Sequence, residues 1–178
     1  TNGYTGAATP ALRRRIVPVG SYIVATAPLP QGVAEALLPR RRMVFDSKNF
    51  LYYFRLSDDN RLLFGGRAQF TSSTESSTRT SAEILRRAMV QVFPALRDVA
   101  LDYAWSGNVG FTRDLLPHAG QREGIHYSMG CCGHGVGMST YLGDAIAQAI
   151  LGRNDRNPFR DLPFPAIPLY SSRPWFLP

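Results

Sequence analysis

The sequence predicts an α+β fold in which an antiparallel sheet with a flanking helix is followed by a strand, a glycine-rich loop and a helix. Three segments rich in β-forming residues follow one another at 43–46, 50–56 and 61–65, and the turn-forming residues 57–60 separate the last two. Further along, an apolar segment at 124–129 precedes four glycines within residues 130–138 and then an apolar pattern with helical spacing.

Length and composition are those of a globular protein. The 178 residues suffice for a hydrophobic core, 44% of them are hydrophobic, and the mean hydropathy is −0.14. No apolar run reaches the roughly 18 residues of a membrane span, so we expect none. The formal charge is +7, but the arginine clusters at 13–15 and 40–42 have no aromatic neighbours, so we expect no nucleic-acid partner.

The first part of the chain supplies the sheet and its helix. Residues 18–27 alternate as a strand, residues 33–38 form one or two helical turns, and residues 71–80 form a mobile loop rich in serine and threonine. We expect a helix to begin near Ser81 and to end before Pro94, and a strand at 101–112 to be bent by its glycines. The inner face of the helix is predicted to consist of Ile84, Leu85, Ala88, Val92 and Phe93.

The last part of the chain begins with a turn-rich connection at 113–120 that leads into the strand at 124–129. The helix after the glycines is expected to bury Met138, Leu142, Ile146 and either Ala149 or Ile150, and small residues on its other positions allow close packing. Residues 157–178 contain six prolines and are expected to lie extended over the surface.

A strand, a glycine loop and a helix start together direct free backbone N–H groups at an anion or a polarised oxygen. The alternative is a tight turn that binds no ligand. His134 either caps a backbone group or contacts a ligand, and Cys131 or Cys132 is a conceivable nucleophile at the helix start. The histidines and cysteines lack the paired spacing of a metal site, so we expect no metal. Adjacent cysteines rarely form a disulfide, which favours a reduced, cytoplasmic setting.

Several motifs together resemble a known family. Trp105-Ser106-Gly107, Thr112-Arg113-Asp114, Pro117, Gly120 and residues 130–138 are similar to the C-terminal signature of FAD-dependent amine and amino-acid oxidoreductases, which include glycine oxidase, sarcosine oxidase and D-amino acid dehydrogenase. Residues 1–5 resemble the strand end where the chain leaves the FAD domain, and residues 61–66 resemble a strand of the substrate domain. Residues 162–168 are closest to members like gamma-glutamylputrescine oxidoreductase, so the resemblance runs nearly end to end.

The resemblance implies four segments. Residues 1–15 would be the end of an FAD-domain segment and the crossover to the substrate domain, and residues 16–112 would form the antiparallel sheet of the substrate domain. Residues 113–156 would form the last strand, loop and helix of the FAD domain, and residues 157–178 would form an extended tail. The nucleotide-binding βαβ unit with its G-x-G-x-x-G is absent from these residues. We therefore expect the chain to be part of a longer enzyme and to be inactive alone, with that N-terminal half as its partner.

The resemblance also implies the cofactor and its contacts. FAD would be held non-covalently and mostly by the absent half, and the loop would lie at the pyrimidine side of the flavin ring. Sarcosine oxidases attach flavin to a cysteine a few residues before T-x-D, and the corresponding place here is near Gly107, which has no nucleophile. The residues expected to contact the cofactor are Gly130, Gly133, His134, Gly135, Val136, Gly137 and Met138.

The substrate is expected to be a small amine whose C–N bond is oxidised by hydride transfer to flavin. Glycine-oxidase-like members bind the substrate carboxylate with an arginine where Val109 stands, and sarcosine-oxidase-like members use a lysine where Gly137 stands. An amine without an adjacent carboxylate is therefore favoured, with Tyr53, Arg55 and Val109 lining the pocket, unless Arg55 or Arg67 replaces the missing charge. Tyr53 and Arg55 are otherwise solvated residues of an outer face. The alternatives to an oxidoreductase are a non-catalytic binding remnant and a thiol enzyme.

Overall fold

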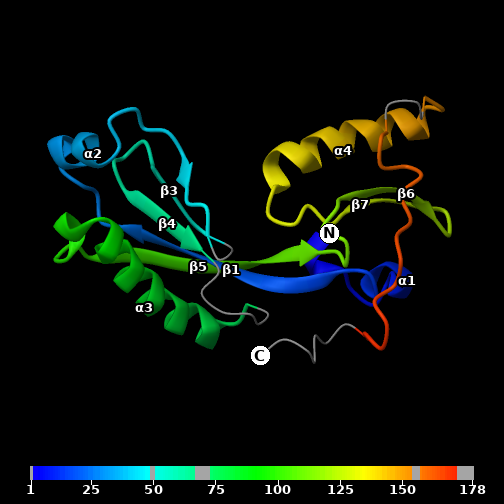
Figure 1. Cartoon of the computed structure of the whole chain (residues 1–178), viewed down its shortest axis with the longest axis horizontal. Coiled ribbons are helices and arrows are strands. Elements are labelled where there is room, and N and C mark those ends of the chain that lie inside the picture. Colours follow the sequence, from blue (N-terminus) through cyan, green and yellow to red (C-terminus); the bar gives the residue numbers. More distant parts are fainter. Residues whose placement is uncertain (1, 49–50, 67–72, 154–156, 172–178) are drawn as a thin grey trace. The chain divides into compact units, whose positions relative to one another are not determined.

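The computed structural model describes residues 2–48, 51–66, 73–153 and 157–171 (Figure 1). The chain divides into two compact units. We call Gly20–Gly107 the sheet unit, and Thr1–Val19 with Asn108–Pro178 the glycine-loop unit. The predicted α+β fold is confirmed, because both units contain helices and the strands pair in an antiparallel manner. The predicted assignment of functions to four segments stays a prediction.

A twisted sheet runs through the sheet unit with the strand order β2-β3-β4-β1-β5. Its strands are β1 (Val17–Thr26), β2 (Val44–Phe45), β3 (Tyr52–Leu56), β4 (Leu62–Gly66) and β5 (Leu101–Phe111). The predicted hairpin is present: the Ser57 N–H donates to the Arg61 carbonyl at 2.9 Å, and Asn60 takes a φ of +62° at the turn. Of the predicted strand at 50–56, Phe50 lies outside the described residues. Antiparallel pairing places Phe54 opposite Phe64, and Tyr53 opposite Gly65.

One face of this sheet is covered by helices. The helix α3 (Glu75–Val92) lies along it (Figure 1), and α2 (Gln31–Leu37) and the short η2 (Pro94–Leu96) complete the layer. Phe54 stacks on Phe64 with ring centroids 5.7 Å apart and meets Phe93 edge-on at 5.1 Å. The buried core consists of Tyr22, Val24, Leu29, Ala34, Leu38, Leu56, Leu62, Phe64, Leu85, Ala88, Met89 and Leu96.

The helix α3 begins earlier than predicted. The prediction of a mobile loop at residues 71–80 is wrong from Thr74 onward, because Thr74 is the N-cap of the helix. The Thr74 side chain accepts a hydrogen bond from the Ser77 N–H at 3.1 Å, and the Ser77 hydroxyl accepts one from the Thr74 N–H at 2.8 Å. Residues 71 and 72 lie outside the described residues. Val92 was predicted to be buried but is 42% exposed, whereas Met89 takes its place in the core.

In the glycine-loop unit, the hairpin of β6 (His118–Arg122) and β7 (Ile125–Met129) packs against α4 (Gly135–Ile150). The short η1 (Asn2–Tyr4) and α1 (Pro10–Arg13) precede β1. The helix α4 buries Leu142 and Ala145, and Met138, Ile146 and Ala149 are half-buried. Of the two alternatives predicted for the end of the inner face, Ala149 is the more buried, since Ile150 is 61% exposed. The strand β6 occupies part of the predicted turn-rich connection at 113–120, so that prediction is wrong at its end.

The described part of the tail is more than a surface segment. Residues 157–171 contain no helix or strand, as expected, but Phe164 and Tyr170 are buried. The Tyr170 hydroxyl donates to the Ile16 carbonyl at 3.0 Å, and the Arg15 Nε donates to the Phe164 carbonyl at 2.7 Å. These contacts hold the tail against a small hydrophobic core that consists of Leu12, Ile16, Met129 and Phe164, with Tyr127 packed beside it. Within the described residues, no helix is long and apolar enough to cross a membrane.

Candidate functional site

The glycine-rich loop joins β7 to α4 and contains left-handed backbone. Gly130 has a φ of +76°, Cys132 of +49° and Gly133 of +99°. A Cβ added at Gly130 would overlap the Thr112 side chain and would lie 3.0 Å from the Leu116 carbonyl oxygen. Glycine at position 130 is therefore required by both its backbone conformation and its packing, whereas an added Cβ at Gly133 would meet nothing within 4 Å.

The start of α4 presents backbone donors that the described protein does not use. Its N-cap residue, His134, makes no side-chain capping bond and is exposed. In the described part of the chain, the N–H groups of Gly135, Val136 and Gly137 have no protein acceptor, while the Met138 N–H donates to the His134 carbonyl at 3.1 Å. The positive end of the helix dipole lies at these three donors. This arrangement suits an anion or a polarised oxygen.

Space is available at this helix start. Val136 is 91% exposed, and a Cβ added at Gly137 would meet nothing within 4 Å. At Gly135 an added Cβ would make an ordinary 3.4 Å contact with the Cys131 Sγ. The seven residues predicted to contact a cofactor, Gly130 and residues 133–138, lie on one loop and the first turn of α4.

Asn2, near the start of the chain, makes two hydrogen bonds to the glycine-rich loop. The Gly130 N–H donates to the Asn2 Oδ1 at 2.9 Å, and the Asn2 Nδ2 donates to the Cys131 Sγ at 2.9 Å. The sequence-based prediction did not include Asn2, and no local pattern marks it, because its partners lie about 130 residues away. Both cysteines are free thiols.

The turn between β5 and β6 supports Gly130, and a buried histidine, His118, begins β6 directly after it. The His118 Nε2 lies 3.1 Å from each Asp114 carboxylate oxygen, and its ring stacks on Phe164 with centroids 4.1 Å apart. Burial would raise the pKa of Asp114, but the hydrogen bonds from His118 and from the Leu116 N–H outweigh it and lower that pKa. The His118 Nδ1 is buried without a hydrogen-bond partner in the described residues, which favours the tautomer whose Nε2–H donates to Asp114.

The residues predicted to line the substrate pocket fall in both units. Tyr53 and Arg55 belong to β3 in the sheet unit, whereas the half-buried Val109 belongs to β5 in the glycine-loop unit. The structure describes Tyr53 and Arg55 together, and their arrangement relative to Val109 stays a prediction. Arg67, the other predicted carboxylate partner, lies outside the described residues.

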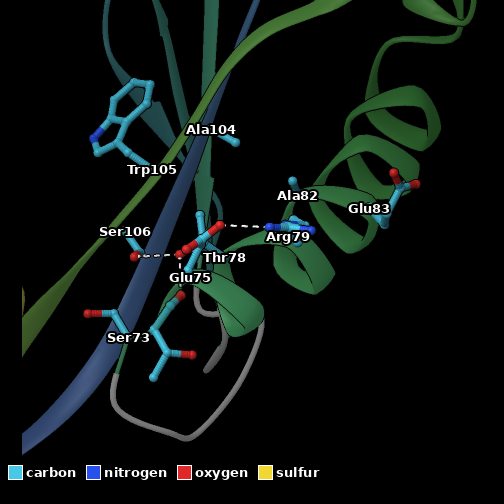
Figure 2. A pocket seen from close by; sticks show the side chains of 10 residues that line it. Ser73, Glu75, Thr78, Arg79, Ala82, Glu83, Ala104, Trp105 and Ser106 are labelled. Carbon is cyan, nitrogen blue, oxygen red and sulfur yellow. Dashed lines mark hydrogen bonds and ion pairs between the residues drawn. The ribbon is translucent and has the colours of Figure 1, made fainter.

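The sheet unit also contains a groove between α3 and β5, with a volume of about 580 Å³ (Figure 2). The Thr78 and Ser106 hydroxyls hydrogen-bond at 2.7 Å across it, and Glu75 pairs with Arg79 at 2.6 Å on its rim. Trp105 and Ser106, which belong to the W-x-G motif, line this groove, but Tyr53 and Arg55 do not. Among the described residues, no group of three or more His, Cys, Asp or Glu side chains could hold a metal ion.

Comparison with known proteins identifies the family. A family model described as FAD dependent oxidoreductase (DAO) matches residues 1–149. The chain belongs to this family. It is 39% identical over 158 residues to the probable oxidoreductase OrdL of Haemophilus influenzae, and 32% identical over 170 residues to the gamma-glutamylputrescine oxidoreductase of Escherichia coli. These matches cover 88% and 94% of the chain, but 35% and 39% of those proteins. The chain therefore spans less than two fifths of the length of these two curated relatives.

Solved structures of several oxidases share the fold. Glycine oxidase from Geobacillus kaustophilus matches with a TM-score of 0.63 at 21% identity, covering 86% of this chain and 40% of that protein. A modified fructosyl peptide oxidase from Aspergillus nidulans matches with a TM-score of 0.70 at 14% identity, covering 93% of this chain and 45% of that protein. At these identities the likeness shows the fold alone, and with the family match it confirms the predicted resemblance.

Proposed function

We propose that this chain is the flavin- and substrate-contacting part of an FAD-dependent oxidoreductase that oxidises a C–N bond of an amine or amino acid. The observation that carries the proposal is the uncapped start of α4, where three consecutive N–H groups lie beside open glycines. FAD, when bound, accepts a hydride from the carbon next to the substrate nitrogen, and water hydrolyses the resulting imine to a carbonyl compound and ammonia or an amine.

The residues of the loop fit the polar edge of a flavin ring. The N–H groups of Gly135, Val136 and Gly137, together with the helix dipole, would stabilise negative charge on the pyrimidine side of a bound flavin. Gly133 leaves the approach open, and Gly130 fixes the loop by packing on Thr112. His134 and Met138 flank the donors, and their side chains are proposed to lie near the ring without providing its main contacts.

The remaining part of FAD is proposed to be bound by polypeptide outside these 178 residues, which contain no G-x-G-x-x-G. The outer surface of α4 supports such a partner. Val136, Tyr141 and Ile150 are 91%, 46% and 61% exposed on this helix. An added Cβ at Gly143 would meet nothing within 4 Å, so another surface can approach this helix closely.

The flavin is proposed to be non-covalently bound. Sarcosine-oxidase-like members carry their attached cysteine near the position of Gly107, which offers no nucleophile here. The Cys131 Sγ accepts a hydrogen bond from Asn2, and the Cys132 Sγ lies 3.7 Å from the Thr112 hydroxyl. Both thiols thus contact residues outside the loop, Asn2 of η1 and Thr112 after β5.

The substrate is proposed to be an amine without a carboxylate on the reacting carbon, such as a polyamine derivative. Val109 and Gly137 occupy the positions where related enzymes place a cation for that carboxylate, and a buried carboxylate without a charged partner costs several kcal/mol. The printed name of a relative, gamma-glutamylputrescine oxidoreductase, supports a substrate of this kind. Tyr53 and Arg55 provide the proposed pocket surface on the sheet unit.

Purification of the enzyme that contains this chain tests the proposal. We expect flavin absorbance and a higher kcat/KM for a gamma-glutamylputrescine-type amine than for glycine, sarcosine or D-alanine. A protein that binds no FAD would refute the assignment as an oxidoreductase. A preference for the amino acids would refute the substrate assignment and leave the flavin assignment standing.

A further inference from the structure

The described part of the tail is anchored on both sides of one buried aromatic residue of the glycine-loop unit (Figure 1). On one side, the buried Asn157 side chain donates to the Ala119 carbonyl of β6 at 3.0 Å. On the other side, the Ile167 N–H donates to the Arg14 carbonyl at 2.9 Å. The residue between these anchors is Phe164, whose ring is therefore held in one place although the segment forms no helix or strand.

Phe164 acts first on the turn between β5 and β6. Its ring stacks on the buried His118 ring, with centroids 4.1 Å apart and planes 10° apart. The His118 Nε2 lies 3.1 Å from both carboxylate oxygens of Asp114, which accepts from the Leu116 N–H at 3.2 Å. The Thr112 hydroxyl completes the turn by donating to the Leu116 carbonyl at 2.9 Å. The orientation of the His118 ring, and with it the shape of the turn, thus depends on the tail.

This turn contacts the glycine-rich loop at Gly130. A Cβ added at Gly130 would overlap the Thr112 side chain and would lie 3.0 Å from the Leu116 carbonyl oxygen, so the loop has no room to shift toward the turn. Phe164 also reaches Gly130 by a second route, because it shares a small core with Met129, the last residue of β7. Both routes therefore meet where β7 ends and the loop begins, and a close-packed interior transmits a displacement along such contacts.

We propose that Phe164 is a positioning residue for the glycine-rich loop: its ring sets the backbone at Gly130 and thereby the direction of the N–H groups of residues 135–137. Gly130 and Gly133 have positive φ, and glycine changes backbone conformation at little cost, so contacts from outside the loop are needed to select one shape. The tail supplies such a contact. The expected effect on flavin rests on the proposed function, whereas the effect on the loop does not.

Phe164→Leu tests this role in the enzyme that contains this chain, since leucine keeps an apolar side chain in the small core but removes the ring that stacks on His118. We expect the dissociation constant for FAD to rise by about three- to thirtyfold, as for residues that act on a site without touching it. Phe164→Tyr retains the ring and should bind FAD to within about twofold of the parent. Phe164→Met serves the same comparison where the leucine variant does not fold.

The matched control is Tyr170→Phe, a conservative change at another buried residue of the tail. It removes the hydroxyl that donates to the Ile16 carbonyl at 3.0 Å and leaves Phe164 on His118. We expect a lower Tm, because a buried carbonyl loses its partner, with FAD affinity within about twofold of the parent. Equal losses of affinity in Tyr170→Phe and Phe164→Leu would indicate a general weakening of the unit and overturn the proposal, as would unchanged affinity in Phe164→Leu.

An enzyme that binds no flavin would refute the proposed function, and hydrogen–deuterium exchange would then decide the role of Phe164 separately. The N–H groups of Gly130, Cys132 and His134 are bonded within the protein, so their exchange reports on the loop. In the flavin-free enzyme they should exchange at least about threefold faster in Phe164→Leu than in the parent, and at the parent rate in Tyr170→Phe. Unchanged exchange in Phe164→Leu would overturn the positioning role.

Discussion

Replacement of Gly135 by valine should weaken flavin binding without unfolding the protein. Gly135 is the first residue of α4, and the nearest atom to an added Cβ is the Cys131 Sγ at 3.4 Å, an ordinary contact. Valine is also a slightly better helix residue than glycine, so the free energy of unfolding should change by less than about 1 kcal/mol. The protein itself therefore tolerates the side chain.

The flavin should not tolerate it. If the ring approaches the backbone at this turn, a branched side chain forces a displacement costing about 1–3 kcal/mol, which corresponds to a loss of affinity of roughly 5- to 150-fold. His134→Ala is the comparison, because the histidine makes no side-chain capping bond and only flanks the donors. We expect it to change affinity by less than about threefold.

Flavin fluorescence titration of the apoenzyme measures both dissociation constants, and thermal unfolding of the same samples verifies the fold. A Gly135→Val protein that binds FAD as tightly as the parent would refute the assignment of the loop. A larger loss in His134→Ala than in Gly135→Val would show that a side chain, and not backbone approach, provides the contact.

Three further outcomes follow from the same geometry. Gly130→Ala should destabilise the protein by about 2–4 kcal/mol through strain and overlap with Thr112, and Gly133→Ala by only about 1 kcal/mol, so thermal unfolding should rank them in that order. Because the pKa of Asp114 is lowered, its carboxylate stabilises the fold above the unfolded value of 3.8, and this stabilisation is lost as the pH falls through the lower folded value. The Tm difference between the parent and Asp114→Asn should accordingly be present at about pH 6 and vanish in strong acid; a constant difference would contradict this. Acid precipitation of the flavin-loaded enzyme should leave the flavin in solution, and colour in the pellet would refute non-covalent binding.

The parts of the fold that were predictable from sequence are those with local signals. The hairpin of β3 and β4 follows from two β-rich segments around a polar turn, and α4 follows from glycines before a helical apolar pattern. The start of α3 was missed because its hydroxyl residues suggested a loop. In the structure the Tyr22 hydroxyl donates to the Ser77 Oγ at 3.0 Å, and Ser81 is fully buried, so these polar residues form part of an interior helix face.

The strand β6 was missed for a different reason. Its sequence, His118-Ala119-Gly120-Gln121-Arg122, has no β-branched residue and no alternation, and its pairing with β7 decides its conformation. Within the site, the glycines and the helix start were evident from sequence. The contacts of Asn2 and the stacking of His118 on Phe164 join distant segments, so only the folded chain shows them.

These distant contacts also explain which donors of the loop remain for a ligand. The Gly130 N–H is bonded to Asn2, the Cys132 N–H donates to the Gly110 carbonyl at 3.3 Å, and the His134 N–H donates to the Cys131 carbonyl at 2.8 Å. The N–H groups of residues 130, 132 and 134, which precede α4, are thus bonded within the protein. The N–H groups of residues 135–137 have no such partner and point along the helix axis, and the positive end of the helix dipole strengthens their attraction for an anion. A neutral apolar ligand would leave these donors unpaired. The loop therefore suits a group that accepts hydrogen bonds and gains negative charge, and the flavin edge that is proposed to bind here would have that property on reduction.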